Sequence, residues 1–364
     1  MQSSLAIKHF RGLDNVKLDG LSHVNVISGK NNVGKTALLE AVFLYSGAYN
    51  PALAMTLNAN RGLGQVRVEF GSTARDTPWD SLFHHFDSQQ TIEIIGIDEA
   101  RDSRSLRLSV VRDHVEMSGL RKSVRETYEA SADVPWASVS VKVLKLEVQH
   151  GKRTSQKYFL ILDARGMRSE PTPPTAPYQG YFLGSRTAWD SAGDADRYGR
   201  LLRRGDDTAV LDVLKIVEPK LKALSVIVEG GVPMLHGDVG MPNVHFVPLP
   251  ILGEGFTRLA SIAIYIASAR GGALMVDEIE NGLHHSILLP VWKAIGKLSR
   301  ELGVQVFATT HSFECIAAAH GASLAADGYG FSLYRLEHQP GGVQAVTYDK
   351  DSLEASLKMG LEIR

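Results

Sequence analysis

The sequence has 364 residues, of which 44% are hydrophobic and 22% are charged, as in ordinary soluble globular proteins. Its 39 basic and 40 acidic residues give a formal net charge of -1, which excludes a histone-like nucleic-acid binder and an acidic disordered chain but not a local basic patch. The single cysteine, Cys315, excludes an intramolecular disulfide. No apolar run reaches the roughly 20 residues that cross a bilayer, and no signal peptide is visible. We therefore expect a cytoplasmic protein without a membrane partner.

The first predicted elements form a strand, a loop and a helix. Strands are expected over residues 5–10 and 23–28, and the second runs directly into a glycine-rich turn. A helix with several apolar positions is expected over 36–46.

The pattern changes between residues 65 and 163, where apolar and polar residues alternate. Alternation with period two is typical of half-buried antiparallel strands. Strands are expected at 66–70, 91–97, 106–111 and 141–148, with a short polar helix at 121–129. The proline-rich stretch 169–177 is expected to be a loop that ends this region.

Strands and helices alternate after residue 180, which predicts a mainly parallel sheet with helices on its faces. Strands are expected at 181–184, 224–228, 244–247, 273–276, 304–308, 331–336 and 343–347. Helices are expected at 207–221 and 256–269, over a segment that includes 291–302 and ends at Gly303, and from Asp351 onward. The predicted fold class is α/β, with an antiparallel β-rich insertion. Residues 1–64 and 180–364 would form one domain, and 65–179 the insertion.

The first chemical motif is a loop between the predicted strand 23–28 and helix 36–46. Its residues are Gly29, Lys30, Asn31, Asn32, Val33, Gly34, Lys35 and Thr36. This G-x-x-x-x-G-K-[ST] pattern is typical of a phosphate-binding loop, in which glycines let backbone N–H groups surround phosphate oxygens at a helix N-terminus. We expect Lys35 to bind the β- and γ-phosphates of ATP, and Thr36 to bind Mg²⁺.

Two adjacent acids follow the apolar run 273–276. An apolar strand that ends in two carboxylates is the Walker B arrangement. We expect Asp277 to hold Mg²⁺, directly or through water, and Glu278 to act as general base on the attacking water. Such a pair could by itself be a solvated turn, but the phosphate-binding loop upstream favours the catalytic interpretation.

Two further features match ABC-class ATPases. His311 closely follows the predicted strand 304–308, where that class places a histidine against the γ-phosphate. Gly253 and Gly255 precede the predicted helix 256–269, where that class carries a signature that faces the γ-phosphate of a second subunit. Because the usual serine is absent, a plain helix N-cap turn is the alternative for these glycines.

Together these motifs resemble the RecF, SMC and OLD branch of ABC ATPases, with a P-loop NTPase fold of the ABC head type. The similarity rests on residues 7–13, 24–27 and 29–40, and on the blocks 277–285 and 305–312, which look especially like OLD-type ATPases of bacteria. Residues 360–364 are similar to the ending of stand-alone members. The resemblance covers 1–46 and 180–364.

The resemblance implies a Mg²⁺-dependent ATPase that sandwiches ATP in a homodimer or higher homo-oligomer. It implies that Asn31 is the loop asparagine of the SMC group, that Arg11 approaches the nucleotide, and that Gly253 and Gly255 complete the partner's site. The implied role is DNA maintenance or anti-phage defence, in which the head gates DNA or a separate effector. The alternative is an ATP-occupied sensor or scaffold that restrains a separate toxin or nuclease with little turnover.

The sequence differs from these ATPase families in three ways. Too few residues follow His311 for a Toprim nuclease domain, and 47–179 is too short and strand-like for a coiled coil, so we expect the ATPase part alone. The Q-loop residue is not placed, because Gln179 and Ser185–Arg186 are equal candidates. A transporter subunit is disfavoured, because the separation from Lys35 to Gly253 contains an insertion that transporters do not need.

Two charged clusters have simpler interpretations. Arg197, Arg200 and Arg204 share one face of a helix and could contact nucleic-acid phosphates, but neighbouring aspartates favour a solvated face. His284 and His285 would diverge by about 100° on a helix, which is poor geometry for joint metal binding.

Overall fold

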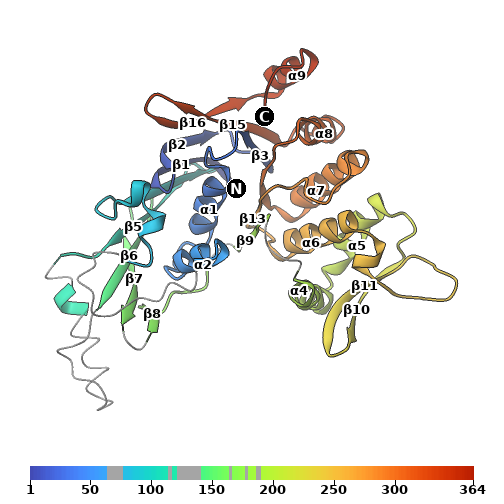
Figure 1. Ribbon diagram of the computed structural model, residues 1–364, viewed down its shortest axis with the longest axis horizontal. Coiled ribbons are helices and arrows are strands. Elements are labelled where there is room, and N and C mark those ends of the chain that lie inside the picture. The colour runs from blue at the N-terminus through green and yellow to red at the C-terminus, as the bar shows by residue number, and fades with distance from the viewer. Residues whose placement is uncertain (64–76, 114–116, 121–140, 164–165, 177–178, 186–189) are drawn as a thin grey trace. The chain divides into compact units, whose positions relative to one another are not determined.

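A computed structural model describes most of the chain (Figure 1). The described residues are 1–63, 77–113, 117–120, 141–163, 166–176, 179–185 and 190–364. The chain divides into two compact units, the first made of Met1–Ser4, Leu18–Ser46 and Tyr178–Arg364, the second of Leu5–Lys17 and Gly47–Pro177. The expected strand 66–70 and helix 121–129 lie outside the described residues.

A six-stranded sheet organises the first unit. In order across the sheet its strands are β16 (Gly342–Tyr348), β15 (Phe331–Gln339), β3 (Val24–Gly29), β14 (Gln305–Thr309), β13 (Ala273–Val276) and β9 (Gly180–Leu183). All neighbours are parallel except β15 and β16, which are antiparallel. Every residue of β3, β13 and β14 is buried, which explains the continuous apolar sequence of β13 and of Val306–Ala308 in β14; β3 also buries Asn25 and Ser28.

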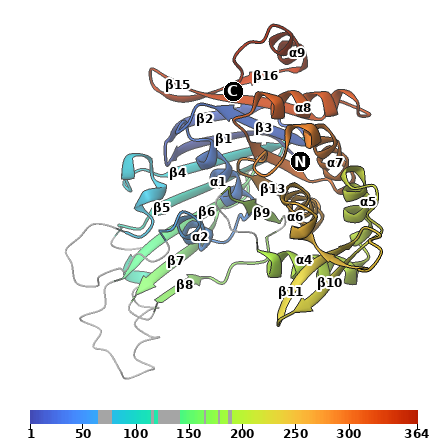
Figure 2. The same ribbon diagram turned by 45° about the vertical axis from the view of Figure 1, so that its right-hand side comes forward.

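Helices cover both faces of this sheet. Helix α1 (Lys35–Ser46) lies on one side, and α6 (Glu254–Ser268), α7 (Leu288–Leu302) and α8 (Phe313–Leu324) lie on the other, as Figures 1 and 2 show. Gly303, at φ 63°, ends α7 in a left-handed conformation, and Ser312 caps α8 by accepting from the Cys315 amide. Cys315 itself is fully buried.

The remaining elements of the first unit pack beside these layers. Strands β10 (Ala223–Glu229), β11 (Val232–Asp238) and β12 (Val247–Pro248) form a small antiparallel sheet. Helices α4 (Ser191–Arg204) and α5 (Asp207–Val217) contact one another and α6, and α9 (Lys350–Lys358) contacts β16.

A seven-stranded sheet, most of whose residues belong to the second unit, has a meandering order. Its strands are β2 (Leu13–Asp19), β1 (Gln2–Phe10), β4 (Ile92–Asp98), β5 (Ser103–Val110), β6 (Lys142–His150), β7 (Gln156–Asp163) and β8 (Gly166–Glu170). From β4 to β8 every neighbouring pair is antiparallel. The predicted fold class, an α/β P-loop fold with a mixed sheet between helices and an antiparallel region, is confirmed.

Several expected boundaries are wrong. The expected strand 244–247 is reduced to its last residue, which pairs in β12, and the expected helix 207–221 ends at Val217. Ser169 and Glu170 of the proline-rich stretch continue β8. Helix α6 begins at Glu254, before the expected 256, because Gly253 takes the capping position and its carbonyl accepts from the Thr257 amide at 3.0 Å.

Among the described residues, no helix is both long and apolar enough to cross a membrane.

Candidate nucleotide-binding site

The predicted phosphate-binding loop joins β3 to α1, as its sequence pattern requires. Gly29 and Gly34 have φ of 132° and 105°, which favour glycine. A Cβ on Gly29 would lie 2.5 Å from the Leu336 carbonyl oxygen, so no other residue fits between the loop and β15. Asn31 and Asn32 are exposed, whereas Val33 is buried. The loop therefore presents its backbone at the N-terminus of α1, where anions bind.

Lys35 lies in the first turn of α1 and is only 6% exposed. Its Nζ donates to the carbonyl oxygens of Gly29 at 2.7 Å and Lys30 at 2.9 Å. Burial lowers the pKa of the ammonium, an effect that the negative charges of Asp277, Glu278 and Glu280 oppose. The ammonium is thus held inside the loop. There a bound phosphate would compensate for the hydration that the ammonium loses on burial.

Asp277 connects three segments at the carboxyl ends of the strands. The carboxylate is 6% exposed and accepts from the hydroxyl of Thr36 at 3.0 Å and of Thr309 at 2.6 Å. The Ser185 hydroxyl lies 3.5 Å from the same carboxylate. Thr36 and Asp277 are 241 residues apart along the chain, yet they meet as the sequence predicts.

The side chains of Thr36 and Asp277 fit a magnesium ion. Both offer oxygen, the donor that Mg²⁺ prefers, and this ion commonly takes one or two protein ligands together with water and substrate phosphates. No cluster of three or more His, Cys, Asp or Glu in the described parts of the chain could hold a metal. A cation at Thr36 and Asp277 would therefore depend on phosphate oxygens, which the neighbouring loop is built to place.

Glu278 has a strained backbone. Its φ of 48° is left-handed, which is uncommon for a residue with a Cβ and concentrates at functional sites. The Glu278 amide donates to the Thr309 hydroxyl at 2.8 Å, and the carboxylate accepts from the Asn281 amide group at 2.7 Å. Thr309 thus bonds to both acids of the pair, so β14 fixes the direction in which Glu278 leaves β13.

His311 is positioned through its backbone by a third acid. Its amide donates to Glu280 Oε1 at 2.7 Å, and the other oxygen of Glu280 is buried without a hydrogen-bond partner. Thr309 and Glu280 are functional candidates that sequence reasoning does not single out. The only signal for them is their place beside Glu278 and His311, at the ends of two neighbouring strands.

Gly253 and Gly255 lie where α6 meets the loop that follows β13. Gly253 has φ 120° with open space around it, whereas a Cβ on Gly255 would lie 2.9 Å from the carbonyl oxygen of Gly282. Gly255 therefore lets two backbones approach within this chain. The packing accounts for Gly255 without a second subunit, and the trans-acting role remains a prediction.

Changing Gly255 to alanine is expected to lower the free energy of unfolding by about 1–3 kcal/mol, because the added methyl group collides with backbone. Gly199→Ala in α4 is the matched control, because its Cβ would meet nothing within 4 Å. This control should leave stability unchanged or raise it by up to about 1 kcal/mol. Urea unfolding of both variants measures the difference, and equal stability of the two would contradict the packing assigned to Gly255.

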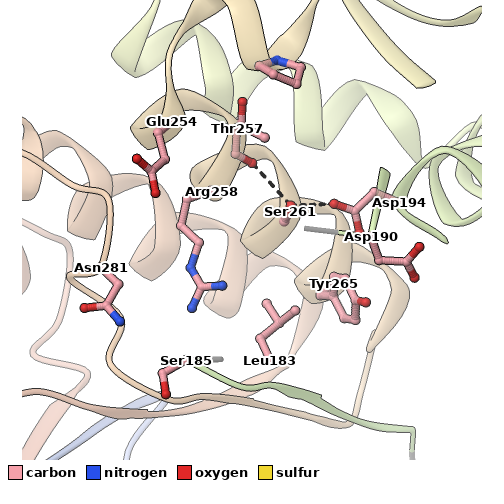
Figure 3. Close-up of a pocket in the computed structure, with 11 residues that line it drawn as sticks. Leu183, Ser185, Asp190, Asp194, Glu254, Thr257, Arg258, Ser261, Tyr265 and Asn281 are labelled. Atoms are coloured by element: carbon pink, nitrogen blue, oxygen red, sulfur yellow. Dashed lines mark hydrogen bonds between the residues drawn. The ribbon is translucent and has the colours of Figure 1, made fainter. Parts of the chain in front are cut away.

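A pocket of about 300 Å³ opens along α6, next to the end of β9 and the start of α4 (Figure 3). Ser185, Glu254, Arg258 and Asn281 line it, and Arg258 donates to the Asp277 carbonyl oxygen at 3.4 Å. Burial lowers the pKa of Arg258, and the charges of Asp194 and Asp277 oppose this shift. Neither acid that follows β13 lines the pocket, which reaches them only through the contact of Arg258 with the Asp277 backbone.

The two Q-loop candidates lie at opposite ends of β9. Gln179 precedes the strand, and its carbonyl accepts from the amide of Ala273 at the start of β13. Ser185 follows the strand and contacts Asp277. The position of Ser185 favours it over Gln179, while Arg186 lies outside the described residues.

Arg11 belongs to the second unit, so its predicted approach to nucleotide remains a prediction. It has φ 51°, and its guanidinium donates to Asn58 Oδ1 at 3.3 Å and the Ser81 carbonyl at 3.4 Å. In the first unit, Arg200 pairs with Asp196, and Arg197 lies 4.0 Å from Asp190. The pair of Arg200 agrees with the solvated-face interpretation, whereas Arg197 is only 22% exposed and packs over the Tyr265 ring at 4.4 Å.

Comparisons with known proteins support an ATPase assignment. Residues 4–158 match a family model described as "AAA domain", and residues 206–316 match one described as "AAA domain, putative AbiEii toxin, Type IV TA system". The chain is 23% identical over 351 residues to an "ATP/GTP phosphatase" of Helicobacter pylori, covering 87% of this chain and 86% of that protein. It is also 44% identical over 48 residues to "Uncharacterized protein MJECL10" of Methanocaldococcus jannaschii, covering 13% and 22% of the two chains. The chain is thus similar to P-loop ATPases of the AAA type.

Solved structures of SMC heads align with nearly the whole chain. A structure titled "Crystal structure of the SmcHead bound to the C-winged helix domain of ScpA" covers 97% of this chain and 99% of its own, at 12% identity and a TM-score of 0.49. The "SMC head domain from Thermotoga maritima" covers 96% and 99%, at 13% identity and a TM-score of 0.43.

Proposed function

We propose that this protein binds ATP at the carboxyl ends of β3, β13 and β14 and hydrolyses it with Mg²⁺. One observation carries the proposal. Lys35 bonds to the phosphate-binding loop, the neighbouring Thr36 bonds to Asp277 at the end of β13, and Glu278 follows Asp277 directly. This is the set of groups that phosphoryl transfer to water requires.

Each residue has a distinct task in this proposal. The loop amides and the Lys35 ammonium bind and orient the phosphates. Thr36 and Asp277 would hold Mg²⁺, which when bound neutralises charge on the phosphate oxygens. Glu278 accepts a proton from the attacking water at its carboxylate, and Asn281 orients that carboxylate beforehand. His311, whose amide is held by Glu280, donates a hydrogen bond to the terminal phosphate.

The variant Asp277→Asn is expected to raise the Mg²⁺ concentration required for half-maximal hydrolysis at least about tenfold, because the ligand loses its negative charge. The amide retains the size of the carboxylate and can still accept from a hydroxyl, so folding should survive. Asp212→Asn, at an exposed position of α5, should leave the requirement unchanged. A magnesium titration of phosphate release compares the two variants, and an unchanged requirement in Asp277→Asn would remove this residue from the proposed metal site.

We further propose that ATP joins two copies through the start of α6, in the manner of an ABC-type head of the OLD or SMC branch. The exposure of this region supports the idea: Ile251, two residues before Gly253, is 71% exposed, and Asn281 and Gly282 are exposed as well. This exposure leaves the start of α6 accessible to a second copy. Opening and closing of the pair would gate DNA or a separate effector, in phage defence or DNA maintenance.

A second candidate function is favoured by the description of the family model that matches residues 206–316, because that description names a toxin–antitoxin system. In this alternative, the ATP-occupied protein restrains a separate toxin or nuclease and turns over slowly. The turnover rate separates the two candidates. If each protein releases less than one phosphate while it stays bound to ATP, restraint of a toxin or nuclease is favoured over gating of DNA or an effector.

A further inference from the structure

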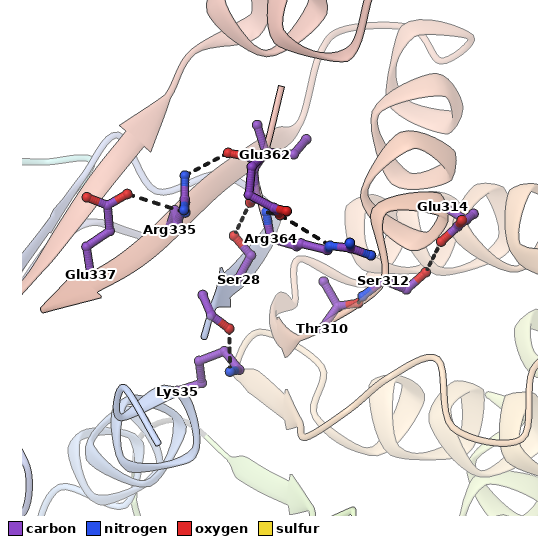
Figure 4. A network of polar contacts seen from close by, with 11 residues as sticks. Ser28, Lys35, Thr310, Ser312, Glu314, Arg335, Glu337, Glu362 and Arg364 are labelled. Atoms are coloured by element: carbon purple, nitrogen blue, oxygen red, sulfur yellow. Dashed lines mark hydrogen bonds and ion pairs between the residues drawn. The ribbon is translucent and has the colours of Figure 1, made fainter. Parts of the chain in front are cut away.

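The segment Gly360–Arg364, which the proposed chemistry does not use, folds back onto the start of the phosphate-binding loop (Figure 4). Gly360, at φ 63°, follows α9 in a left-handed conformation, and the Leu361 amide then bonds to the Ser356 carbonyl at 2.9 Å. Ile363 is fully buried in the hydrophobic core of the first unit. This side chain anchors the segment at the sheet.

Two neighbouring strands hold two successive carbonyl groups of this segment. The Ser28 hydroxyl of β3 donates to the Ile363 carbonyl at 2.7 Å, and the Arg335 guanidinium of β15 donates to the Glu362 carbonyl at 2.7 Å. Ser28 and Arg335 are paired in the β3–β15 register, so the segment crosses both strands at one level. Ser28 is fully buried, which makes the Ile363 carbonyl important for satisfying its hydroxyl.

Ser28 is directly adjacent in the chain to the first residue of the proposed nucleotide site. Ser28 precedes Gly29, whose carbonyl accepts from the Lys35 ammonium. On its other side Gly29 has no room for a Cβ, because of the Leu336 carbonyl of β15. Gly29 is therefore fixed by β15 directly and by the 360–364 segment through Ser28.

We propose that Ser28 and Ile363 are positioning residues for phosphate binding: the 360–364 segment sets the conformation of the phosphate-binding loop through the Ser28–Ile363 hydrogen bond. The inference rests on the proposed ATP site. The bond holds the backbone at residues 28–29 against the segment. Ser28→Ala removes its donor, and Ile363→Ala removes the buried side chain that holds its acceptor carbonyl in place. In either case the Gly29 carbonyl that orients Lys35 is held less firmly.

The test compares Ser28→Ala and Ile363→Ala with the wild-type chain in two measurements. Without nucleotide, amide hydrogen exchange over residues 29–35 should become about tenfold faster in both variants, because the loop opens more often. The affinity for a fluorescent ATP analogue should fall about tenfold, or about 1.4 kcal/mol, because the loop less often has the conformation that binds phosphate. Ser28→Thr, which keeps the hydroxyl, should restore both values.

Leu214→Ala is the control for general destabilisation, because Leu214 is fully buried in the same core but lies on α5. It should lower the melting temperature without changing exchange at 29–35 or nucleotide affinity. Wild-type exchange at 29–35 in Ser28→Ala would overturn the inference, and this variant decides the question even if Ile363→Ala does not fold. Because the exchange measurement uses no nucleotide, it tests the segment separately from the ATP site.

Discussion

Lys35→Ala is expected to slow ATP hydrolysis at least about 100-fold and to weaken ATP binding about tenfold or more. Loss of a preorganised charge at a phosphoryl-transfer site typically has an effect of this size. The ammonium sits inside the loop with only 6% of the residue exposed, so no solvent cation can occupy its place with the same geometry. Phosphate release and binding of a labelled ATP analogue measure the two effects.

The matched control for this variant is Lys358→Ala. The Lys358 side chain is 73% exposed on α9 and pairs with Glu354, so its loss should change neither rate nor affinity. Circular dichroism and thermal unfolding would verify that Lys35→Ala remains folded. A folded Lys35→Ala protein with wild-type turnover would rule out the loop as the site of hydrolysis.

Glu278→Gln is expected to reduce hydrolysis by about 10²–10⁴-fold while ATP remains bound, because the amide cannot accept the proton of the attacking water. The amide can still pair with Asn281, so the strained backbone at φ 48° should be retained. Single-turnover phosphate release, together with the nucleotide content of the purified protein, measures this separation of binding from chemistry.

The same variant also reports on assembly. With ATP and Mg²⁺, light scattering after size-exclusion chromatography should show a mass twice that of the nucleotide-free protein. Glu301→Gln, at a half-exposed position of α7 that pairs with Lys297, should behave like wild type in both measurements. Equal loss of ATP binding and hydrolysis in Glu278→Gln would instead give this residue a role in binding.

The parts of the site that could be predicted are those with a local pattern. Gly29–Thr36 stands between a strand and a helix, and Asp277–Glu278 ends an apolar strand, so chain order alone predicts that they meet at the carboxyl edge of a parallel sheet. The structure brings Thr36 within 3.0 Å of Asp277, in agreement with this prediction. Strands β13 and β14 were predictable because fully buried parallel strands have continuous apolar sequences.

The parts that could not be predicted depend on which strands are neighbours. Thr309 bonds to both Asp277 and the Glu278 amide only because β14 lies between β3 and β13, an order that no local pattern specifies. The return of Ile363 to Ser28 spans nearly the whole chain. The start of α6 was misplaced because Gly253 provides a capping conformation at φ 120°, which the periodicity of apolar residues does not reveal.

Hydrolysis of ATP at the phosphate-binding loop is tested by phosphate release from the purified wild-type chain, with and without Mg²⁺. We expect Mg²⁺-dependent release that Lys35→Ala and Glu278→Gln each reduce at least about 100-fold. Absence of ATP binding in the wild-type chain, or release that neither substitution alters, would contradict this expectation.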